Sequence, residues 1–253
     1  MVQQVAAGYS PVDSGWWDEL RDVVIEVVED DAGTVGGVVA WATRQSDGAG
    51  LILCLHGREE PGVIGLLVDH ALERLDRCSQ IEAFAFATAL SGGAGLEALP
   101  IWRRSITDST LRSRGFQGKN RWRYMRQRLP AIGLPRVTDG LVVEPTDAFS
   151  RRLTVDRQGE TVATAELSVV EDRIGVLWWL EVETSARGQG LGRRLLGSAL
   201  EVLGSLGAIE VILYVDDDGK HGGARDRTVA KHLYRRAGFT EIDRLFSYER
   251  SAS

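Results

Sequence analysis

The chain of 253 residues contains the stretch Leu180-Glu181-Val182-Glu183-Thr184-Ser185-Ala186-Arg187-Gly188-Gln189-Gly190-Leu191-Gly192. This order is typical of a buried strand that ends in a glycine-rich turn and leads into a helix. Gly188, Gly190 and Gly192 carry no side chains, so consecutive backbone N–H groups can face an anion, and the positive end of the following helix adds to the attraction. The stretch therefore predicts a site for a phosphate or a nucleotide pyrophosphate.

Two better-known phosphate motifs do not fit this turn. A dinucleotide fingerprint G-x-G-x-x-G that starts at Gly188 requires glycine where Arg193 stands, and the Gly-Lys-Ser/Thr ending of a P-loop is missing. A plain strand-to-helix connection is the remaining alternative, but such connections rarely need three spaced glycines.

Hydrophobic periodicity predicts alternating strands and helices on both sides of the turn. In the second half we expect strands at 152–156, 161–170, 174–182, 209–215 and 241–250, and helices at 190–206 and 228–237. In the first half we expect strands at 23–29, 35–43, 51–56, 81–89 and 122–128, a helix at 63–77, and a short helix that ends near 114–115.

The two halves also resemble each other residue by residue. The segment Leu111-Arg112-Ser113-Arg114-Gly115-Phe116 matches Tyr234-Arg235-Arg236-Ala237-Gly238-Phe239 at an offset of 123 residues, and the same offset lays 51–57 over 174–180. We infer an internal duplication. Two prolines and a glycine in 130–135 indicate a connector, so we expect one domain at 1–130 and a second at 131–253.

Composition excludes several classes of protein. The formal net charge is −6, which argues against nucleic acid as a partner. No apolar run approaches the ~20 residues that span a bilayer, residues 1–10 lack the pattern of a secretory signal, and two cysteines are too few for a disulfide framework. We therefore expect a cytoplasmic protein that binds neither membrane, nucleic acid nor metal.

With Arg187, Gly190 and Gly192 as fixed positions, the turn reads R-x-x-G-x-G and resembles the acetyl-coenzyme A signature of the GNAT N-acetyltransferase superfamily. The segment 233–239 is similar to the second signature of that superfamily. The resemblance covers roughly 152–250, and the first half resembles a degenerate second copy, in a tandem arrangement similar to that of mycothiol synthases. It implies an α/β fold with two GNAT-like domains, each a mixed, mostly antiparallel twisted sheet flanked by helices.

The resemblance also implies acetyl-CoA as co-substrate and a role for each site residue. The strands at 174–182 and 209–215 would splay apart around the pantetheine arm. The N–H of Leu180 would then stabilise the oxyanion, and Val182 would hydrogen-bond the arm. Tyr234 would donate a proton to the departing thiolate, whose conjugate thiol has a pKa of roughly 8.5, a transfer expected to be favourable. The remaining cofactor contacts are expected from Arg187, Gly188, Gln189, Gly190, Gly192 and Arg193.

A general base is also required, because an alkylamine has a pKa of about 10.4. Glu181, at the end of the central strand, is the preferred candidate, although a carboxylate at a strand end is often simply solvated. Glu183, His221 and His232 are alternatives. For Tyr234 the structural alternative is a core aromatic on the apolar stripe of its helix.

Two departures from the family pattern affect the expected site. Arg227 stands where the family has an asparagine that contacts the cofactor arm, which puts that contact in doubt. In the first half, Leu111 occupies the position of the catalytic tyrosine, and the turn at 57–65 lacks the glycine spacing. We therefore expect no productive cofactor binding by the first copy.

The sequence as a whole predicts an N-acetyltransferase that moves an acetyl group from acetyl-CoA to a primary amine of a small molecule, by direct attack through a tetrahedral intermediate. A protein or peptide amine is the alternative acceptor. A non-catalytic acetyl-CoA sensor and an unrelated phosphate-binding module are two further interpretations. The sequence leaves open whether the chain acts as a homodimer.

Overall fold

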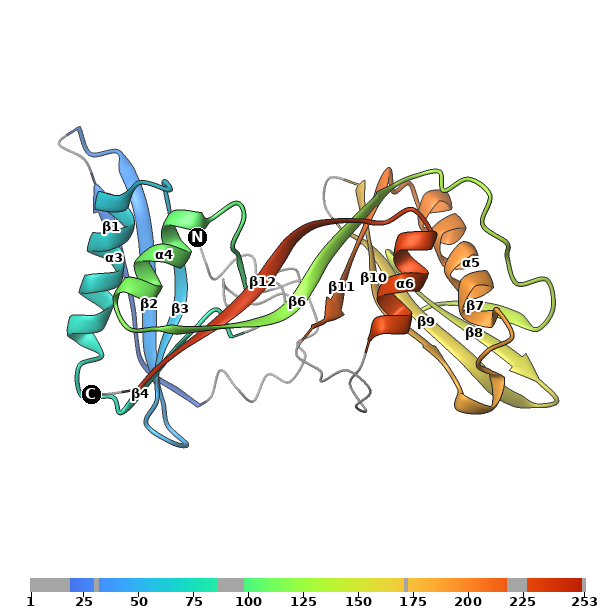
Figure 1. Ribbon diagram of the computed structural model, residues 1–253, viewed down its shortest axis with the longest axis horizontal. Coiled ribbons are helices and arrows are strands. Elements are labelled where there is room, and N and C mark those ends of the chain that lie inside the picture. The colour runs from blue at the N-terminus through green and yellow to red at the C-terminus, as the bar shows by residue number, and fades with distance from the viewer. Residues whose placement is uncertain (1–18, 30–31, 86–97, 171–172, 218–226, 252–253) are drawn as a thin grey trace. The chain divides into compact units, whose positions relative to one another are not determined.

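The computed structural model describes residues 19–29, 32–85, 98–170, 173–217 and 227–251 (Figure 1). The chain forms two compact units. Unit 1 comprises residues 1–122 and 243–253, and unit 2 comprises residues 123–242. Two long strands, β6 (Gln117–Arg128) and β12 (Thr240–Ser251), each contribute residues to both units.

Unit 1 contains a mixed sheet whose strands follow the order β1-β2-β3-β4-β12. The β3–β4 pair is parallel and the other neighbours are antiparallel. Its elements besides β6 and β12 are β1 (Leu20–Glu29), β2 (Val35–Arg44), β3 (Gly50–Gly57), α3 (Pro61–Arg74), β4 (Gln80–Ala83), β5 (Leu99–Pro100) and α4 (Ser105–Ser113). Its core is formed by these strands together with α3 and α4, and includes Tyr248 of β12.

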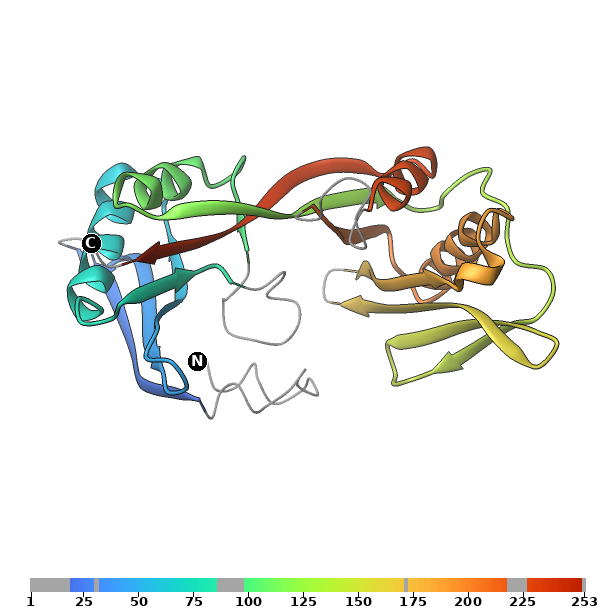
Figure 2. The same cartoon turned by 60° about the horizontal axis from the view of Figure 1, so that its bottom comes forward.

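Unit 2 contains the strands β6-β11-β10-β9-β8-β7 of the same 12-stranded sheet, in that order. The β10–β11 pair is parallel, whereas β9, β8 and β7 continue the sheet in antiparallel fashion, with the β7–β8 hairpin at its edge (Figure 2). Its elements besides β6 are β7 (Leu141–Pro145), β8 (Ser150–Arg157), β9 (Glu160–Val170), β10 (Ile174–Val182), the 3₁₀ turn η4 (Thr184–Ala186), α5 (Leu191–Ser205), β11 (Glu210–Asp216) and α6 (Thr228–Arg236).

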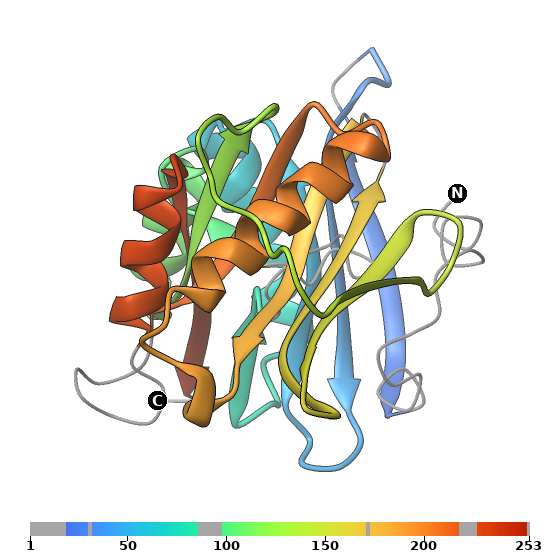
Figure 3. The same ribbon diagram turned by 90° about the vertical axis from the view of Figure 1, so that its right-hand side faces the viewer.

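Helix α5 lies across the sheet of unit 2 (Figure 3). Leu191, Leu195, Ala199 and Leu203 recur every four residues and are buried, so they form the apolar stripe of an amphipathic helix. Each fully buried leucine contributes roughly 1.5–3 kcal/mol through the surface that it removes from water. The stripe packs on one face of the sheet, and α6 contributes Tyr234 to the same core.

The structure confirms the internal repeat. Helices α4 and α6 each have nine residues, and strands β6 and β12 each have twelve; in both pairs the elements begin and end 123 residues apart. The expected strands and helices are present. Strand β7 was not expected, and β4 ends at Ala83, before Phe84 adopts a φ of 56°.

The boundary between the two compact units does not fall at the proposed connector, residues 130–135. Residues 123–128 of the first repeat belong to unit 2, and residues 243–251 of the second repeat belong to unit 1. The division at 130/131 stays a prediction about the two sequence repeats, whereas the cores are divided near residues 122 and 242. Within the ranges that the structure describes, no helix has the length and apolar composition to cross a bilayer, and no group of metal-ligating side chains is found.

Candidate active site

The site expected from the sequence lies where β10 and β11 part. Their parallel pairing covers only three positions, Ile174 with Glu210, Gly175 with Val211 and Val176 with Ile212. Strand β10 continues to Val182 and β11 continues to Asp216, so the rest of each strand has no ladder partner in the other. The expected divergence of these strands is therefore present.

Strand β10 remains paired with β9 along this divergent segment, which fixes where its amides point. The N–H of Glu183 donates to the carbonyl of Val162 at 2.9 Å, on the β9 side. Because successive backbone groups of a strand point to alternate sides, the N–H groups of Val182 and Leu180 point away from β9, toward the gap. A one-residue bulge at Trp178 precedes them.

The glycine turn adopts the backbone that its composition predicts. Gly188 and Gly190 have φ values of 77° and 72°, in the left-handed region that favours glycine. Helix α5 begins at Leu191, and the N–H of Arg194 donates to the carbonyl of Gly190 at 3.2 Å. The preceding N–H groups at the start of α5 have no acceptor within the helix, so they can bind an anion.

Gly192 differs from the other two glycines. It lies inside the first turn of α5, and a Cβ atom built on it would be 3.5 Å from Val182 Cγ2 and 3.8 Å from Leu233 Cδ2, which are ordinary contacts. The fold itself therefore tolerates alanine here. A bare backbone at this position is consistent with a ligand that lies against it.

Three other predicted cofactor residues lie around the turn. The guanidinium Nε of Arg187 donates to the carbonyl of Val182 at 2.8 Å, so this side chain ties the turn to the strand end. Arg157 donates to the side-chain oxygen of Gln189 at 3.0 Å. Arg193 is exposed on the first turn of α5. Their roles as cofactor ligands stay predictions.

Tyr234 lies on α6 and is 9% exposed, with its ring edge-to-face against Phe239 at 5.8 Å. Within the described part of the chain its hydroxyl makes no hydrogen bond. Burial raises the pKa of Tyr234 to about 12, against an opposing effect of the Arg227 cation. A resting thiolate with a conjugate pKa of roughly 8.5 is a weaker base by ~3.5 units, so full proton transfer costs ~5 kcal/mol. The raised pKa favours a hydrogen bond from the phenol to the sulfur over full proton transfer, and the role of Tyr234 as proton donor stays a prediction.

The candidate bases differ in their surroundings. The Glu181 side chain is exposed at the end of β10 and accepts a hydrogen bond from the indole Nε1 of Trp179 at 3.2 Å. Glu183 is exposed just beyond the strand, and His232 is exposed on α6. His221 lies outside the described residues. The structure thus holds Glu181 in place, and its role as base stays a prediction.

Arg227, at the family's asparagine position, forms the N-cap of α6 and pairs with Asp216 at 3.3 Å. The next residue, Asp217, has a side chain that is only 9% exposed and pairs with Arg123 at 2.9 Å and with Lys231. This network fixes the end of β11 against β6 and α6. Apart from the run of aspartates that begins at Asp216, no pattern in the sequence indicated this network.

The corresponding place in unit 1 is filled by the chain itself. The carboxylate of Glu59 accepts hydrogen bonds from the backbone N–H groups of Ile106 and Thr107, both at 3.0 Å, at the start of α4. Arg104, the counterpart of Arg227, pairs with Glu59 at 3.2 Å and donates to the carbonyl of Leu55 at 2.7 Å. Helix α3 begins with a proline, which has no N–H, and the fully buried Leu111 has no acidic group. The first copy is degenerate in structure as well as in sequence.

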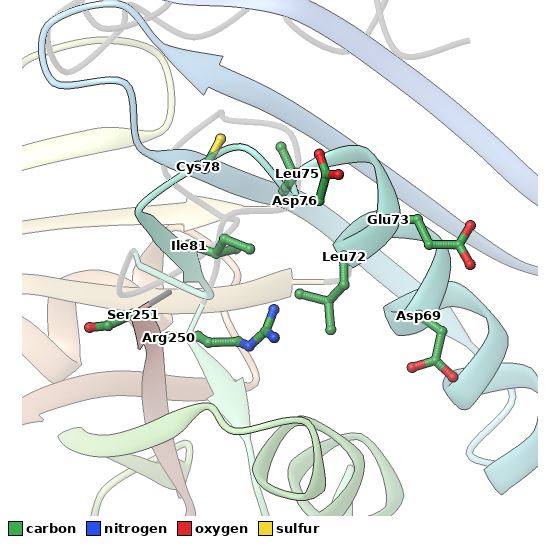
Figure 4. A pocket seen from close by; sticks show the side chains of 9 residues that line it. All are labelled: Asp69, Leu72, Glu73, Leu75, Asp76, Cys78, Ile81, Arg250 and Ser251. Atoms are coloured by element: carbon green, nitrogen blue, oxygen red, sulfur yellow. The ribbon is translucent and has the colours of Figure 1, made fainter. Parts of the chain in front are cut away.

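A shallow pocket of about 550 Å³ lies elsewhere in unit 1, between α3 and the end of β12 (Figure 4). Two acidic side chains of α3, Asp69 and Glu73, line it, together with Asp76, Cys78 and Arg250. One of the acids, Asp69, is already paired with Arg114 at 2.8 Å. The pocket has no residue in common with the glycine turn or with the gap beside β10.

Comparison with known proteins agrees with this geometry. Residues 122–239 match the acetyltransferase (GNAT) family. A mycothiol acetyltransferase from Beutenbergia cavernae is 34% identical over 87 residues, which cover 34% of this chain and 27% of that protein. The chain therefore matches only about a quarter of the length of this relative.

Solved structures resemble the chain at the level of the fold. A tandem GNAT protein from the clavulanic acid biosynthesis pathway has a TM-score of 0.64 at 14% identity, covering 100% of this chain and 87% of that chain. A GCN5-related N-acetyltransferase from Sphaerobacter thermophilus has a TM-score of 0.61 at 14% identity, covering 90% and 80%. An acetyltransferase of the GNAT family from Colwellia psychrerythraea has a TM-score of 0.59 at 10% identity, covering 99% and 94%.

The mixed sheet, the parted strands and the glycine turn before a helix agree with the GNAT fold of these solved structures. Residues 122–239 match the GNAT family of acetyltransferases, and the two repeats are similar to the arrangement of the tandem GNAT protein. The duplication inferred from two short matching segments is thus the arrangement of a known type of GNAT protein.

Proposed function

We propose that the chain is an N-acetyltransferase that uses acetyl-CoA and acts on a primary amine of a small molecule, with unit 2 as the active unit. The observation that carries this proposal is the gap beside β10. There the N–H groups of Leu180 and Val182 point away from β9, and the β10–β11 ladder has already ended at Val176.

Each part of the site then has a chemical task. The free amides at the start of α5 would hold the diphosphate, and the absence of a side chain at Gly192 would let it approach. The N–H of Val182 would hydrogen-bond the pantetheine arm. The N–H of Leu180 would donate to the thioester oxygen and stabilise the negative charge that develops there.

In the reaction the amine nitrogen forms a bond to the thioester carbon, and the carbon–sulfur bond breaks. The amine must lose a proton, for which Glu181 is the proposed acceptor. The leaving thiolate would accept a hydrogen bond from Tyr234, which keeps its own proton because burial raises its pKa to about 12. Stabilisation of the oxyanion by the preorganised amide is expected to supply the largest single effect.

The proposal is tested by the release of free thiol from acetyl-CoA across a panel of small amines, aminoglycosides and peptides. Small amines are expected to be the better acceptors. A preference for peptides would contradict the small-molecule acceptor and support a protein or peptide amine instead. If acetyl-CoA binds tightly but no amine leads to thiol release, the chain is an acetyl-CoA sensor and the enzyme proposal fails.

Cofactor binding has its own test in thermal unfolding. Acetyl-CoA is expected to raise the unfolding midpoint, whereas ATP and NAD are not, because a ligand that binds only the folded state stabilises it. Gly192→Ala is expected to leave the unliganded midpoint unchanged while it weakens acetyl-CoA binding about tenfold, since the new methyl group stands between amide and phosphate. Equal shifts with all three ligands would contradict a specific CoA site.

A further inference from the structure

The sheet of unit 2 has a second face that its helices do not cover. The core-facing residues Leu177, Leu180 and Val182 of β10 lie on the side of α5 and α6. Trp178, Trp179 and Glu181 lie outside that core, and the two indole side chains are 37% and 50% exposed. Exposed patches of large aromatic residues often mark binding surfaces. The two indoles lie beside the proposed reaction site, so they are candidates for binding a substrate.

Hydrogen bonds hold these side chains in place. The indole Nε1 of Trp178 donates to the hydroxyl of Ser168, a buried residue of β9, at 2.7 Å. The indole Nε1 of Trp179 donates to the carboxylate of Glu181 at 3.2 Å. The exposed ring and the carboxylate beside it therefore form one preorganised pair.

No cation of the described residues pairs with the carboxylate of Glu181. On the same face, Glu166 is paired with Arg152 across the β8–β9 ladder at 2.9 Å. For Glu181 the described residues supply only the indole N–H and no cation. Two further aromatic side chains of unit 2, Tyr124 of β6 and Tyr214 of β11, stack with ring centroids 5.1 Å apart.

We infer that Trp179 and Glu181 form the recognition site for the acceptor, which is a protonated primary amine carried on a molecule with a flat apolar ring. This inference deepens the proposed function and rests on it. An ammonium group is attracted both by the face of an indole ring and by a carboxylate. A flat ring of the ligand would stack on the exposed aromatic surface, which gains from the burial of apolar area.

The position of the pair suits this task. Glu181 follows Leu180, whose N–H is the proposed donor to the thioester oxygen, while Tyr234 belongs to the core on the opposite face of the sheet. An amine bound by Trp179 and Glu181 would thus approach the thioester from the face opposite the tyrosine. The bound ammonium loses one proton to the Glu181 carboxylate, and the neutral nitrogen then attacks the thioester carbon. As the carbon–sulfur bond breaks, the second proton of the nitrogen passes through solvent to the leaving thiolate.

The experiment uses three probes with the full-length chain. Benzylamine carries both charge and ring, butylamine carries the charge alone, and benzyl alcohol carries the ring alone. Binding is followed by ligand-observed NMR in the presence of acetyl-CoA, and turnover is followed by thiol release. Benzylamine is expected to bind about tenfold more tightly than either partial probe, since each lacks one of the two attractions.

Variants assign the effect to residues. Trp179→Ala and Glu181→Gln are each expected to raise the benzylamine Kd and KM about tenfold, and Trp179→Phe, which keeps a ring, is expected to recover much of the Trp179→Ala loss. Glu160→Gln, at an exposed turn of the same sheet, and Trp102→Ala, at an exposed position of unit 1, are matched controls that should change neither constant. Thermal unfolding of each variant separates loss of binding from loss of fold.

The outcomes distinguish the inference from the function on which it rests. If benzylamine binds through Trp179 and Glu181 but no thiol is released, the acetyltransferase proposal fails and the recognition site stands. If thiol is released while folded Trp179→Ala and Glu181→Gln keep the wild-type KM, the recognition site is overturned and the enzyme stands. Equal binding of all three probes also overturns it.

Discussion

At the scale of single residues, the burial of Tyr234 gives the clearest expectation. Its phenol sits in the core of unit 2, and burial raises its pKa to about 12. We expect Tyr234→Phe to lower kcat about 100-fold, as for the loss of one hydrogen-bond donor to a charge that develops in the transition state, with acetyl-CoA affinity unchanged. Because the group stays protonated up to pH 11, the shape of the pH–rate profile between pH 6 and 10 should be the same for both proteins.

The same substitution has a separate effect on stability at high pH. A folded-state pKa above the ordinary value of ~10 means that the unfolded chain loses this proton first. The stabilising contribution of the neutral phenol is therefore fully present below pH 10 and is lost as the pH rises toward 12. Denaturant unfolding should show wild type losing more stability than Tyr234→Phe over that interval. If the free energy of unfolding fell equally with pH in both proteins, Tyr234 would not be a buried, neutral phenol.

At the scale of elements, two of the three glycines of helix α5 differ in the space that surrounds them. A Cβ atom on Gly197 would lie 2.2 Å from the carbonyl oxygen of Pro135, because the connector crosses the helix there and Val137 N–H donates to Ser198 Oγ at 3.1 Å. A Cβ atom on Gly204 would have only Leu129 Cδ1 within reach, at 3.9 Å. Gly197 therefore permits a close approach, and Gly204 merely weakens the helix.

We expect Gly197→Ala to destabilise the protein by about 1–3 kcal/mol, since the helix or connector must shift to admit the methyl group. Gly204→Ala, in the same helix, should instead stabilise it by about 0.5–1 kcal/mol through better helix propensity. Urea unfolding of both variants measures the two effects. Similar changes for both would mean that the connector does not pack on α5 in this way.

The elements show how far the sequence could predict this molecule. Spaced glycines predicted the turn because Gly188 and Gly190 need a left-handed backbone, which is a local property. Gly197 gave no such signal, since its requirement comes from a segment sixty residues earlier. The pair formed by Trp179 and Glu181 was also missed, because alternation along a strand indicates a shared face but no hydrogen bond.

At the scale of the whole molecule, the two repeats exchange their last strands between the cores. Met125 of β6, in the first repeat, is fully buried in the core of unit 2, and Arg123 pairs there with the largely buried Asp217. The second repeat has Phe246 and Tyr248 at the matching positions, 123 residues later. Its own last strand could not replace β6 without removing Arg123, one of the two cations that pair with Asp217.

Unit 1 depends on the second repeat in the same way. The carboxylate of Asp243 is fully buried and accepts backbone hydrogen bonds from Trp102 at 2.9 Å and Arg103 at 3.2 Å. Tyr248 is buried in the core of unit 1 and its hydroxyl donates to Asp108. A chain cut between the repeats therefore yields two pieces that each lack part of a core.

We accordingly expect fragments 1–130 and 131–253 to be unfolded or aggregated when expressed separately. Losing a large buried side chain costs about 3 kcal/mol or more, and each fragment loses several contacts of its core, against a total stability of ~5–15 kcal/mol. Mixed during refolding, the fragments should restore one complex, detected by circular dichroism and gel filtration. As a control, a protease site placed at the exposed Ile132 and cut after folding should leave the two pieces associated. If fragment 131–253 alone unfolded cooperatively at the midpoint of the whole chain, the second repeat would be able to close on its own last strand, and the exchange would not be required for folding.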